Sequence, residues 1–160
     1  MNVVIIGCGR VGAALAGLLD TAGDTVTIVD LDRAAFLHLP REFKGTTLLG
    51  DGTDLDVLRQ AGVERADTFL TLTQGDNRNI MAAQIAAKIF GIKKVIAKVN
   101  DPIRAYTYRK QGLETFSRTS ILATLLQALI AGSTTLGPNL MAAAMSHEAA
   151  MSGEDLPERA

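Results

Sequence analysis

Six residues near the start of the chain combine glycine spacing with the context that phosphate binding requires. Gly7–Gly12 has the sequence Gly-Cys-Gly-Arg-Val-Gly, which fits the pattern G-x-G-x-x-G. It follows a short apolar β-branched run and opens a segment with helical periodicity, and this context makes it far more specific than the glycines alone. We expect Gly7 to allow a tight turn, Gly9 to admit a pyrophosphate and Gly12 to bring the helix close to the strand. The N-terminus of that helix would then attract the phosphates.

The other residues of this loop are weaker candidates for cofactor binding. Arg10 is a candidate to contact phosphate oxygens through its guanidinium group, and the alternative is a solvated surface arginine. Cys8 is either a small buried filler or a thiol activated at the helix N-terminus, but the sequence has no second cysteine that would resolve a disulfide. Val11 completes the predicted cofactor-binding loop.

A carboxylate follows the second predicted strand. Asp30 stands eighteen positions beyond Gly12, where nucleotide-binding folds of this type place an acidic residue on the ribose hydroxyls. Its charge would repel a 2′-phosphate, which disfavours NADP. Leu31 is expected beside the cofactor, and Asp32 is a weaker candidate that would instead cap the following helix.

A third group of polar residues ends the third predicted strand. Asp51, Gly52 and Thr53 lie in the segment Gly-Asp-Gly-Thr-Asp. Ligands of open α/β sheets bind outside the carboxyl ends of the strands, which would place this segment near an adenine ring. A plain turn followed by a helix cap explains the same residues equally well.

Strand-like and helix-like segments alternate along the chain and predict where these groups lie. Predicted strands are Val3–Ile6, Thr25–Val29, Thr46–Leu49, Thr68–Leu72, Lys94–Val99 and Glu114–Ser117. Predicted helices are Val11–Thr21, Ala34–Leu39, Asp54–Ala61, Ile80–Phe90, Pro102–Lys110, Ile121–Ala131 and Asn139–Ala150. The alternation indicates an α/β fold, a Rossmann-like doubly wound parallel sheet of six strands in the order 3-2-1-4-5-6. We expect residues 1–132 to form the nucleotide-binding domain and residues 133–160 a tail or short helical extension.

Two predicted helices carry apolar stripes. In the first, Val11, Leu15, Leu18 and Leu19 share one face. In Ile121–Ala131, a wide stripe comprises Ile121, Leu122, Leu125, Leu126, Leu129 and Ile130. It would cover either the domain's own sheet or a second subunit, and a symmetric dimer would bury it twice.

Composition excludes several classes of function. A net charge of −1 gives no basic surplus for nucleic acid. No apolar run reaches the roughly 18 residues that a membrane span needs, so membrane association would require a partner. His38 and His147 are far apart without other ligands at metal spacing, and we expect no metal site. No nucleophile elbow or catalytic triad is visible.

The chain resembles the KTN domain, the nucleotide-binding N-terminal lobe of the RCK family that regulates Trk and Ktr potassium transporters. The resemblance rests on Gly7–Gly12, Asp30, Gly50–Asp54, Ala66–Asn79 and the Ala-Lys-Val-Asn-Asp-Pro segment at 97–102. It implies binding of NAD(H), ATP, ADP or AMP, with Thr73 beside the phosphates and Lys98 reaching in from the fifth strand. It also implies a homodimer or larger ring on a potassium-translocating membrane subunit, at the cytoplasmic face of the cell membrane.

Two departures from the family limit what the resemblance implies. Relatives often carry an acidic residue just after the sixth strand, where this chain has Arg118-Thr119-Ser120, so metal-assisted ATP sensing is not expected. The second, C-terminal RCK lobe is also absent from this sequence. Residues 133–160 contain nothing that could serve as the substrate domain of a hydride-transfer enzyme. Together with the resemblance, this predicts a regulatory nucleotide sensor rather than an enzyme, with a small NAD-dependent oxidoreductase, or a subunit of one, as the alternative.

Overall fold

The computed structural model describes residues 1–132 and 138–153 and divides into two compact units, Met1–Ala97 and Lys98–Ala160. The first unit contains β1 (Asn2–Ile6), α1 (Arg10–Thr21), β2 (Thr25–Asp30), η1 (Arg33–His38), β3 (Thr46–Leu49), α2 (Leu55–Gln60), η2 (Val63–Arg65), β4 (Thr68–Thr71), α3 (Asp76–Lys88) and most of β5 (Lys94–Lys98). The second contains α4 (Pro102–Lys110), β6 (Glu114–Phe116), α5 (Arg118–Ile130) and α6 (Pro138–Met151).

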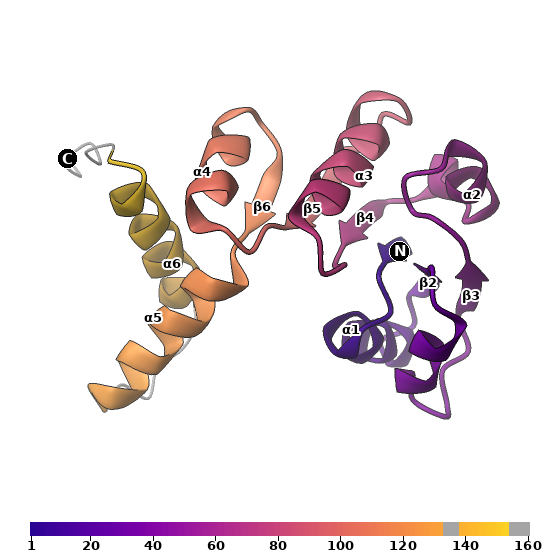
Figure 1. Cartoon of the computed structure of the whole chain (residues 1–160). Coiled ribbons are helices and arrows are strands. Elements are labelled where there is room, and N and C mark those ends of the chain that lie inside the picture. Colours follow the sequence, from indigo (N-terminus) through magenta and orange to yellow (C-terminus); the bar gives the residue numbers. More distant parts are fainter. Residues whose placement is uncertain (133–137, 154–160) are drawn as a thin grey trace. The chain divides into compact units, whose positions relative to one another are not determined.

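The strands form one six-stranded sheet in the order β3-β2-β1-β4-β5-β6, which confirms the predicted topology. The pairs β1–β2, β1–β4, β2–β3 and β4–β5 are all parallel. In the first unit, α1 lies on one face of the strands, and α2 and α3 lie on the other (Figure 1). The order reverses between β1 and β4, and ligands of such sheets bind at the carboxyl ends of the strands flanking that point.

The central strands are buried on both faces, as their continuous apolar sequence predicts. Val3, Val4, Ile5 and Ile6 of β1 are all buried, and so are Val26, Ile28 and Val29 of β2. β3 is an edge strand, and none of its residues is buried. The core of this unit is therefore centred on β1, directly behind the glycine loop.

The buried face of α1 is lined by small residues rather than by its long aliphatic ones. Its buried residues are Gly12, Ala13, Ala16 and Gly17, whereas Val11 and Leu18 are exposed and Leu15 and Leu19 are half-buried. Small residues line the inner face because α1 packs so closely on neighbouring segments that longer side chains would not fit between them. An added Cβ on Gly17, for example, would lie 2.6 Å from the Pro40 side chain. The face that carries the long aliphatic residues of α1 is therefore not the face that the helix buries.

The helix after β4 begins a turn earlier than predicted. α3 starts at Asp76 rather than Ile80, with Gly75 at its N-cap, and it ends at Lys88. The polar sequence Asp-Asn-Arg-Asn hides this first turn from an apolar-periodicity argument. The earlier start places Asn79 in the core, fully buried, and Arg78 on the exposed side of the same turn.

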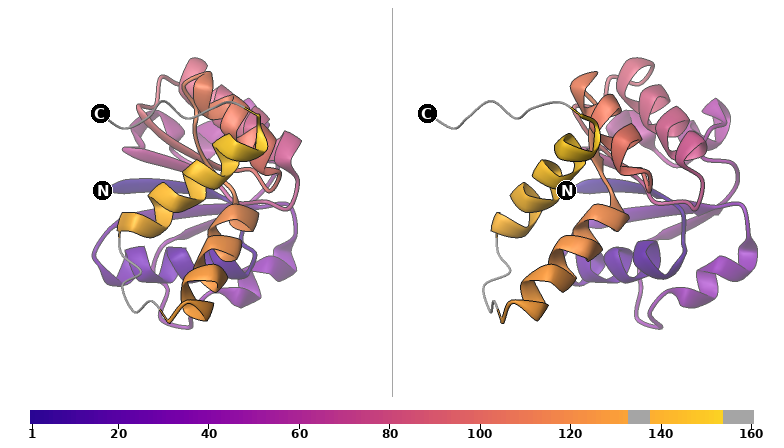
Figure 2. Two further views of the ribbon diagram at one scale, coloured as in Figure 1. Left: turned by 90° about the vertical axis from the view of Figure 1, so that its left-hand side faces the viewer. Right: turned by 60° about the vertical axis from the view of Figure 1, so that its left-hand side comes forward.

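In the second unit, a partly buried ion pair connects α6 to α4. α5 and α6 lie side by side (Figure 2), and α6 also packs on α4. The Arg109 guanidinium donates hydrogen bonds to the Glu148 carboxylate at 2.7 Å and to the backbone oxygen of Thr115 at 2.8 Å. Glu148 is 1% exposed. α6 spans the helix predicted at Asn139–Ala150, while residues 133–137 and 154–160 of the predicted tail lie outside the described residues.

Among residues 1–132 and 138–153, no helix has both the length and the apolar character needed to span a membrane.

Candidate functional site

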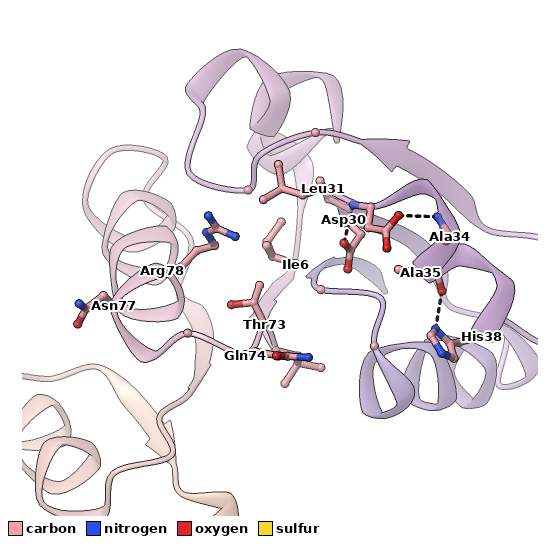
Figure 3. Close-up of a pocket in the computed structure, with 18 residues that line it drawn as sticks. Ile6, Asp30, Leu31, Ala34, Ala35, His38, Thr73, Gln74, Asn77 and Arg78 are labelled. Atoms are coloured by element: carbon pink, nitrogen blue, oxygen red, sulfur yellow. Dashed lines mark hydrogen bonds between the residues drawn. The ribbon is translucent and has the colours of Figure 1, made fainter.

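A pocket of about 680 Å³ opens at the carboxyl ends of the central strands of the first unit (Figure 3). Its walls come from the ends of β1, β2 and β4, the start of α1 and α3, and the turns after β2 and β3. The lining residues are Ile6, Gly7, Gly9, Val29, Asp30, Leu31, Asp32, Ala34, Ala35, His38, Gly50, Gly52, Leu72, Thr73, Gln74, Gly75, Asn77 and Arg78. Six residues predicted from the sequence are therefore brought together here: Gly7, Gly9, Asp30, Leu31, Gly52 and Thr73.

The three glycines of the loop meet different steric demands. Gly7 has φ +106°, and an added Cβ would lie 2.9 Å from the backbone of Leu72 and of Thr73. On Gly12 an added Cβ would lie 2.0 Å from the carbonyl oxygen of Gly7. Gly9 has no heavy atom within 4 Å of its added Cβ and faces the pocket. Thus Gly7 and Gly12 are required by packing, and Gly9 alone leaves free space.

That free space lies at the N-terminus of α1. Gly9 is the N-cap and supplies no side-chain hydrogen bond to the helix. The first intrahelical bond runs from the Ala13 N–H to the Gly9 oxygen, so the N–H groups of the preceding turn have no acceptor within the helix. Such N–H groups, with the partial positive charge of the helix end, suit a phosphate. The backbone of this loop therefore fits the diphosphate of a nucleotide.

Asp30 ties the glycine loop to the end of β2. One carboxylate oxygen accepts a hydrogen bond from the Cys8 N–H at 2.6 Å, and the other accepts one from the Asp32 N–H at 2.9 Å. A carboxylate offers about four acceptor positions, so two remain for a ligand such as a pair of ribose hydroxyls. The same residue positions the loop and faces the pocket, and sequence spacing alone revealed only the second role.

Three residues of the loop do not line the pocket. Cys8 is fully buried, and burial, with a smaller effect of Asp30, raises the pKa of its thiol to about 11. Since the thiolate is the reactive form, we expect the thiol to be inert, which favours the filler interpretation. Arg10 and Val11 are exposed and are not among the lining residues.

The turn after β3 is held together by its own side chains. Asp51 accepts hydrogen bonds from both the N–H and the hydroxyl of Thr53, at 2.9 and 2.8 Å. These bonds, above all the backbone one, lower the pKa of the Asp51 carboxyl below its ordinary value. Gly52 lines the pocket, and its added Cβ would lie 2.2 Å from the Ile6 side chain. Asp51 and Thr53 shape this wall but are not lining residues themselves.

Thr73 is held in place by a residue that the sequence analysis did not single out. The buried side-chain oxygen of Asn79 accepts hydrogen bonds from the N–H and the hydroxyl of Thr73, at 2.9 and 2.7 Å. Its amide nitrogen donates to the Thr73 carbonyl at 3.0 Å. No sequence signal marked this role, because Asn79 ends a polar run of four residues that precedes the predicted helix.

Two cations differ in their relation to the pocket. Lys98, the last residue of β5, is buried, begins the second unit and is not a lining residue, so its role at the site stays a prediction. Arg78 lines the pocket from the first turn of α3, and no sequence motif indicated it. In residues 1–132 and 138–153, no three histidine, cysteine or acidic side chains cluster as metal ligands.

A six-stranded parallel sheet in this order, with a glycine loop between β1 and α1, defines a Rossmann-like domain. The TrkA-N domain family matches residues 3–118, and the chain belongs to that family.

Named relatives are consistent with this assignment. The Trk system potassium uptake protein TrkA of Streptomyces coelicolor is 45% identical over 115 residues, 72% of this chain and 52% of that protein. The chain thus spans about half the length of the curated relatives it matches. The crystal structure of GsuK bound to ADP is 26% identical, with a TM-score of 0.68 over 81% of this chain and 33% of that one. A GsuK channel bound to NAD, 24% identical with a TM-score of 0.69, covers 91% of this chain and 25% of its own, and supports the fold.

Proposed function

We propose that this chain is the nucleotide-sensing domain of a Trk-type potassium-uptake system. The observation that carries the proposal is the pocket itself, where the open backbone at Gly9 and the spare acceptor positions of Asp30 lie together. The match to the TrkA-N family and the similarity to a potassium uptake protein support a role in potassium uptake. Its ligand is an adenine nucleotide, NAD(H) or ATP, ADP or AMP. Its partner is a potassium-translocating membrane subunit, at whose cytoplasmic face the domain assembles.

The domain acts as a regulator, because ligand binding shifts the equilibrium between two conformational states of its assembly. A ligand changes an assembly only by the difference in its affinity for two states, so nucleotides that fill the pocket differently would favour different assemblies. The carboxylates at the pocket support a binding role rather than catalysis. Asp30 is engaged by two loop N–H groups, and Asp32 caps η1 by accepting from the Ala34 N–H. Turnover of a nicotinamide substrate would instead make the chain a small oxidoreductase.

The pocket is expected to prefer NAD(H) over NADP(H) by at least about tenfold. The Asp30 carboxylate would face the 2′-phosphate of NADP, and like charges brought together cost more than the ~1.4 kcal/mol that a factor of ten represents. Calorimetric titration with both cofactors measures the ratio. Tighter binding of NADPH would contradict the assignment of Asp30 to the ribose.

A control variant separates Asp30 from its neighbour. Asp32→Asn keeps a good N-cap for η1 and removes the second carboxylate that lines the pocket. The variant should discriminate between the two cofactors as the parent does. If discrimination disappears, Asp32 rather than Asp30 repels the 2′-phosphate.

We also propose that the chain forms a homodimer or larger ring through an apolar face of α5. This α5 face consists of Leu122, Leu126, Leu129 and Ile130, which are 50–88% exposed. The remaining stripe residues, Ile121 and Leu125, are half-buried within the second unit. A contiguous exposed apolar surface of this kind is typical of an interaction site.

Charges on the α5 face are expected to dissociate the assembly. The parent should be dimeric or larger at tens of micromolar, and Leu122→Glu/Leu126→Glu should be monomeric, because each leucine would lose about 1.5–3 kcal/mol of burial. Light scattering measures the mass in solution. Ala123→Glu/Gln127→Glu adds the same charges at neighbouring exposed positions and should dissociate less. A monomeric parent would refute the dimer, and a double leucine variant that stays dimeric would move the interface elsewhere.

A further inference from the structure

The two ends of the pocket differ in chemistry. One end is polar backbone, formed by the glycine loop and the carboxylate of Asp30. The other end carries larger side chains, with Ile6 at its base and Leu31 and Arg78 at its sides. Figure 3 shows Leu31 and Arg78 reaching into the pocket from opposite walls, Leu31 from the residue after β2 and Arg78 from the first turn of α3.

The Arg78 guanidinium belongs to the end formed by the turn after β3. Its positive charge contributes, after the hydrogen bonds from Thr53, to the lowered pKa of Asp51. Gly50 and Gly52, which precede and follow Asp51 in the sequence, line the pocket together with Arg78. Among the described residues that line the pocket, Arg78 is the one lysine or arginine. A cation placed here faces whatever part of a ligand lies beyond the ribose, on the side away from the phosphates.

Leu31 presents the matching surface on the opposite wall. It is 49% exposed although it is a large apolar side chain, and it directly follows Asp30. A nucleotide whose ribose meets Asp30 and whose phosphates meet the glycine loop would extend its base between Leu31 and Arg78. One face of that slot is apolar, and the other carries a planar cation.

We propose that Leu31 and Arg78 form the adenine slot of this domain, with the Arg78 guanidinium stacked over one face of the base. The proposal rests on the nucleotide binding proposed above and adds the residue that recognises the base. A guanidinium group is planar and weakly hydrated, so it stacks on aromatic faces at a small desolvation cost. Nucleic-acid-binding proteins use the same contact to hold unpaired bases. Arg78 is thus a base-recognition residue rather than a phosphate ligand.

The test compares the parent with Arg78→Ala and Arg78→Lys in calorimetric titrations with AMP, ADP and ATP. Stacking predicts that Arg78→Ala weakens all three nucleotides by the same factor, roughly 2- to 30-fold, the range that cation–π contacts span. Arg78→Lys should recover little of the loss, because an ammonium group lacks the planar surface. A loss that grows from AMP to ATP, with affinity restored in Arg78→Lys, would show that Arg78 contacts phosphate and would overturn the proposal.

A matched control removes the effect of net charge. Arg41 is an exposed arginine in the same unit that does not line the pocket, so Arg41→Ala should bind all three nucleotides like the parent. A parent that binds neither these three nucleotides nor NAD(H) would contradict the proposed function itself. A parent that binds them, with Arg78→Ala binding equally well, would leave the proposed function standing and overturn the adenine slot.

Discussion

Gly9→Val is expected to abolish nucleotide binding while leaving the domain folded. No heavy atom lies within 4 Å of an added Cβ on Gly9, and its φ of −69° is accessible to any residue. The valine side chain would occupy the space where a pyrophosphate meets the backbone. The cost to the fold is limited to a poorer N-cap for α1, about 1 kcal/mol. Calorimetry with the nucleotide that the parent binds, together with circular dichroism, measures both quantities.

Gly12→Ala provides the contrasting variant in the same loop. Its single added carbon would lie 2.0 Å from the carbonyl oxygen of Gly7, which is backbone and cannot rotate away. Overpacking of this kind costs about 1–3 kcal/mol and sometimes more, so this variant should be destabilised in urea denaturation. If Gly9→Val is folded and binds as the parent does, the nucleotide site lies elsewhere in the chain.

Glu148→Ala is expected to lower the free energy of unfolding by at most about 3–5 kcal/mol, the range for breaking a fully buried ion pair from one side. The Arg109 side chain is 23% exposed, so water can solvate part of its charge. The carboxylate is 1% exposed and accepts the 2.7 Å bond from Arg109. Its loss would leave the Arg109 charge without its counter-ion, and the Arg109 Nε is already buried with no hydrogen-bond partner. Urea denaturation followed by circular dichroism measures the change.

Two further variants separate the ion pair from the helix that carries it. His147→Ala alters the exposed neighbour of Glu148 on α6 and should leave stability within about 0.5 kcal/mol of the parent. Arg109→Met/Glu148→Leu removes both charges and should recover most of the loss, since apolar replacement of a buried pair is often neutral or stabilising. A single Glu148→Ala variant as stable as His147→Ala would show that the pair does not hold α6 in solution.

Much of the fold can be predicted from the sequence, because local patterns of apolar residues indicate which segments are buried. The run Val3–Ile6 is continuous and β-branched, and it is the central strand β1, buried on both faces. The alternation of strands with helices, combined with the right-handed crossover rule, predicted the strand order that the sheet has. The glycine loop was recognisable because Gly7 adopts a positive φ and Gly12 approaches the Gly7 carbonyl, and both requirements arise within the loop itself.

Periodicity does not identify the buried face of a helix where the packing distance matters more than hydrophobicity. The long aliphatic residues of α1 share one face, but the helix buries Gly12, Ala13, Ala16 and Gly17 instead. A sequence pattern records which residues are apolar and does not record how closely two backbones approach. The contact between Gly12 and the Gly7 carbonyl sets that approach, and it is a tertiary property.

The sequence alone determined the sheet, the loop and the strand-end carboxylate, because these depend on residue types within one or two adjacent elements. Only the tertiary structure decided which partners those residues have. Asp30 bonds the Cys8 N–H across 22 positions, and Arg109 pairs with Glu148 across 39. A polar side chain accepts a hydrogen bond from any donor that folding brings within reach. Such partners, like the place of Arg78 in the pocket wall, therefore follow from chain geometry and cannot be read from spacing.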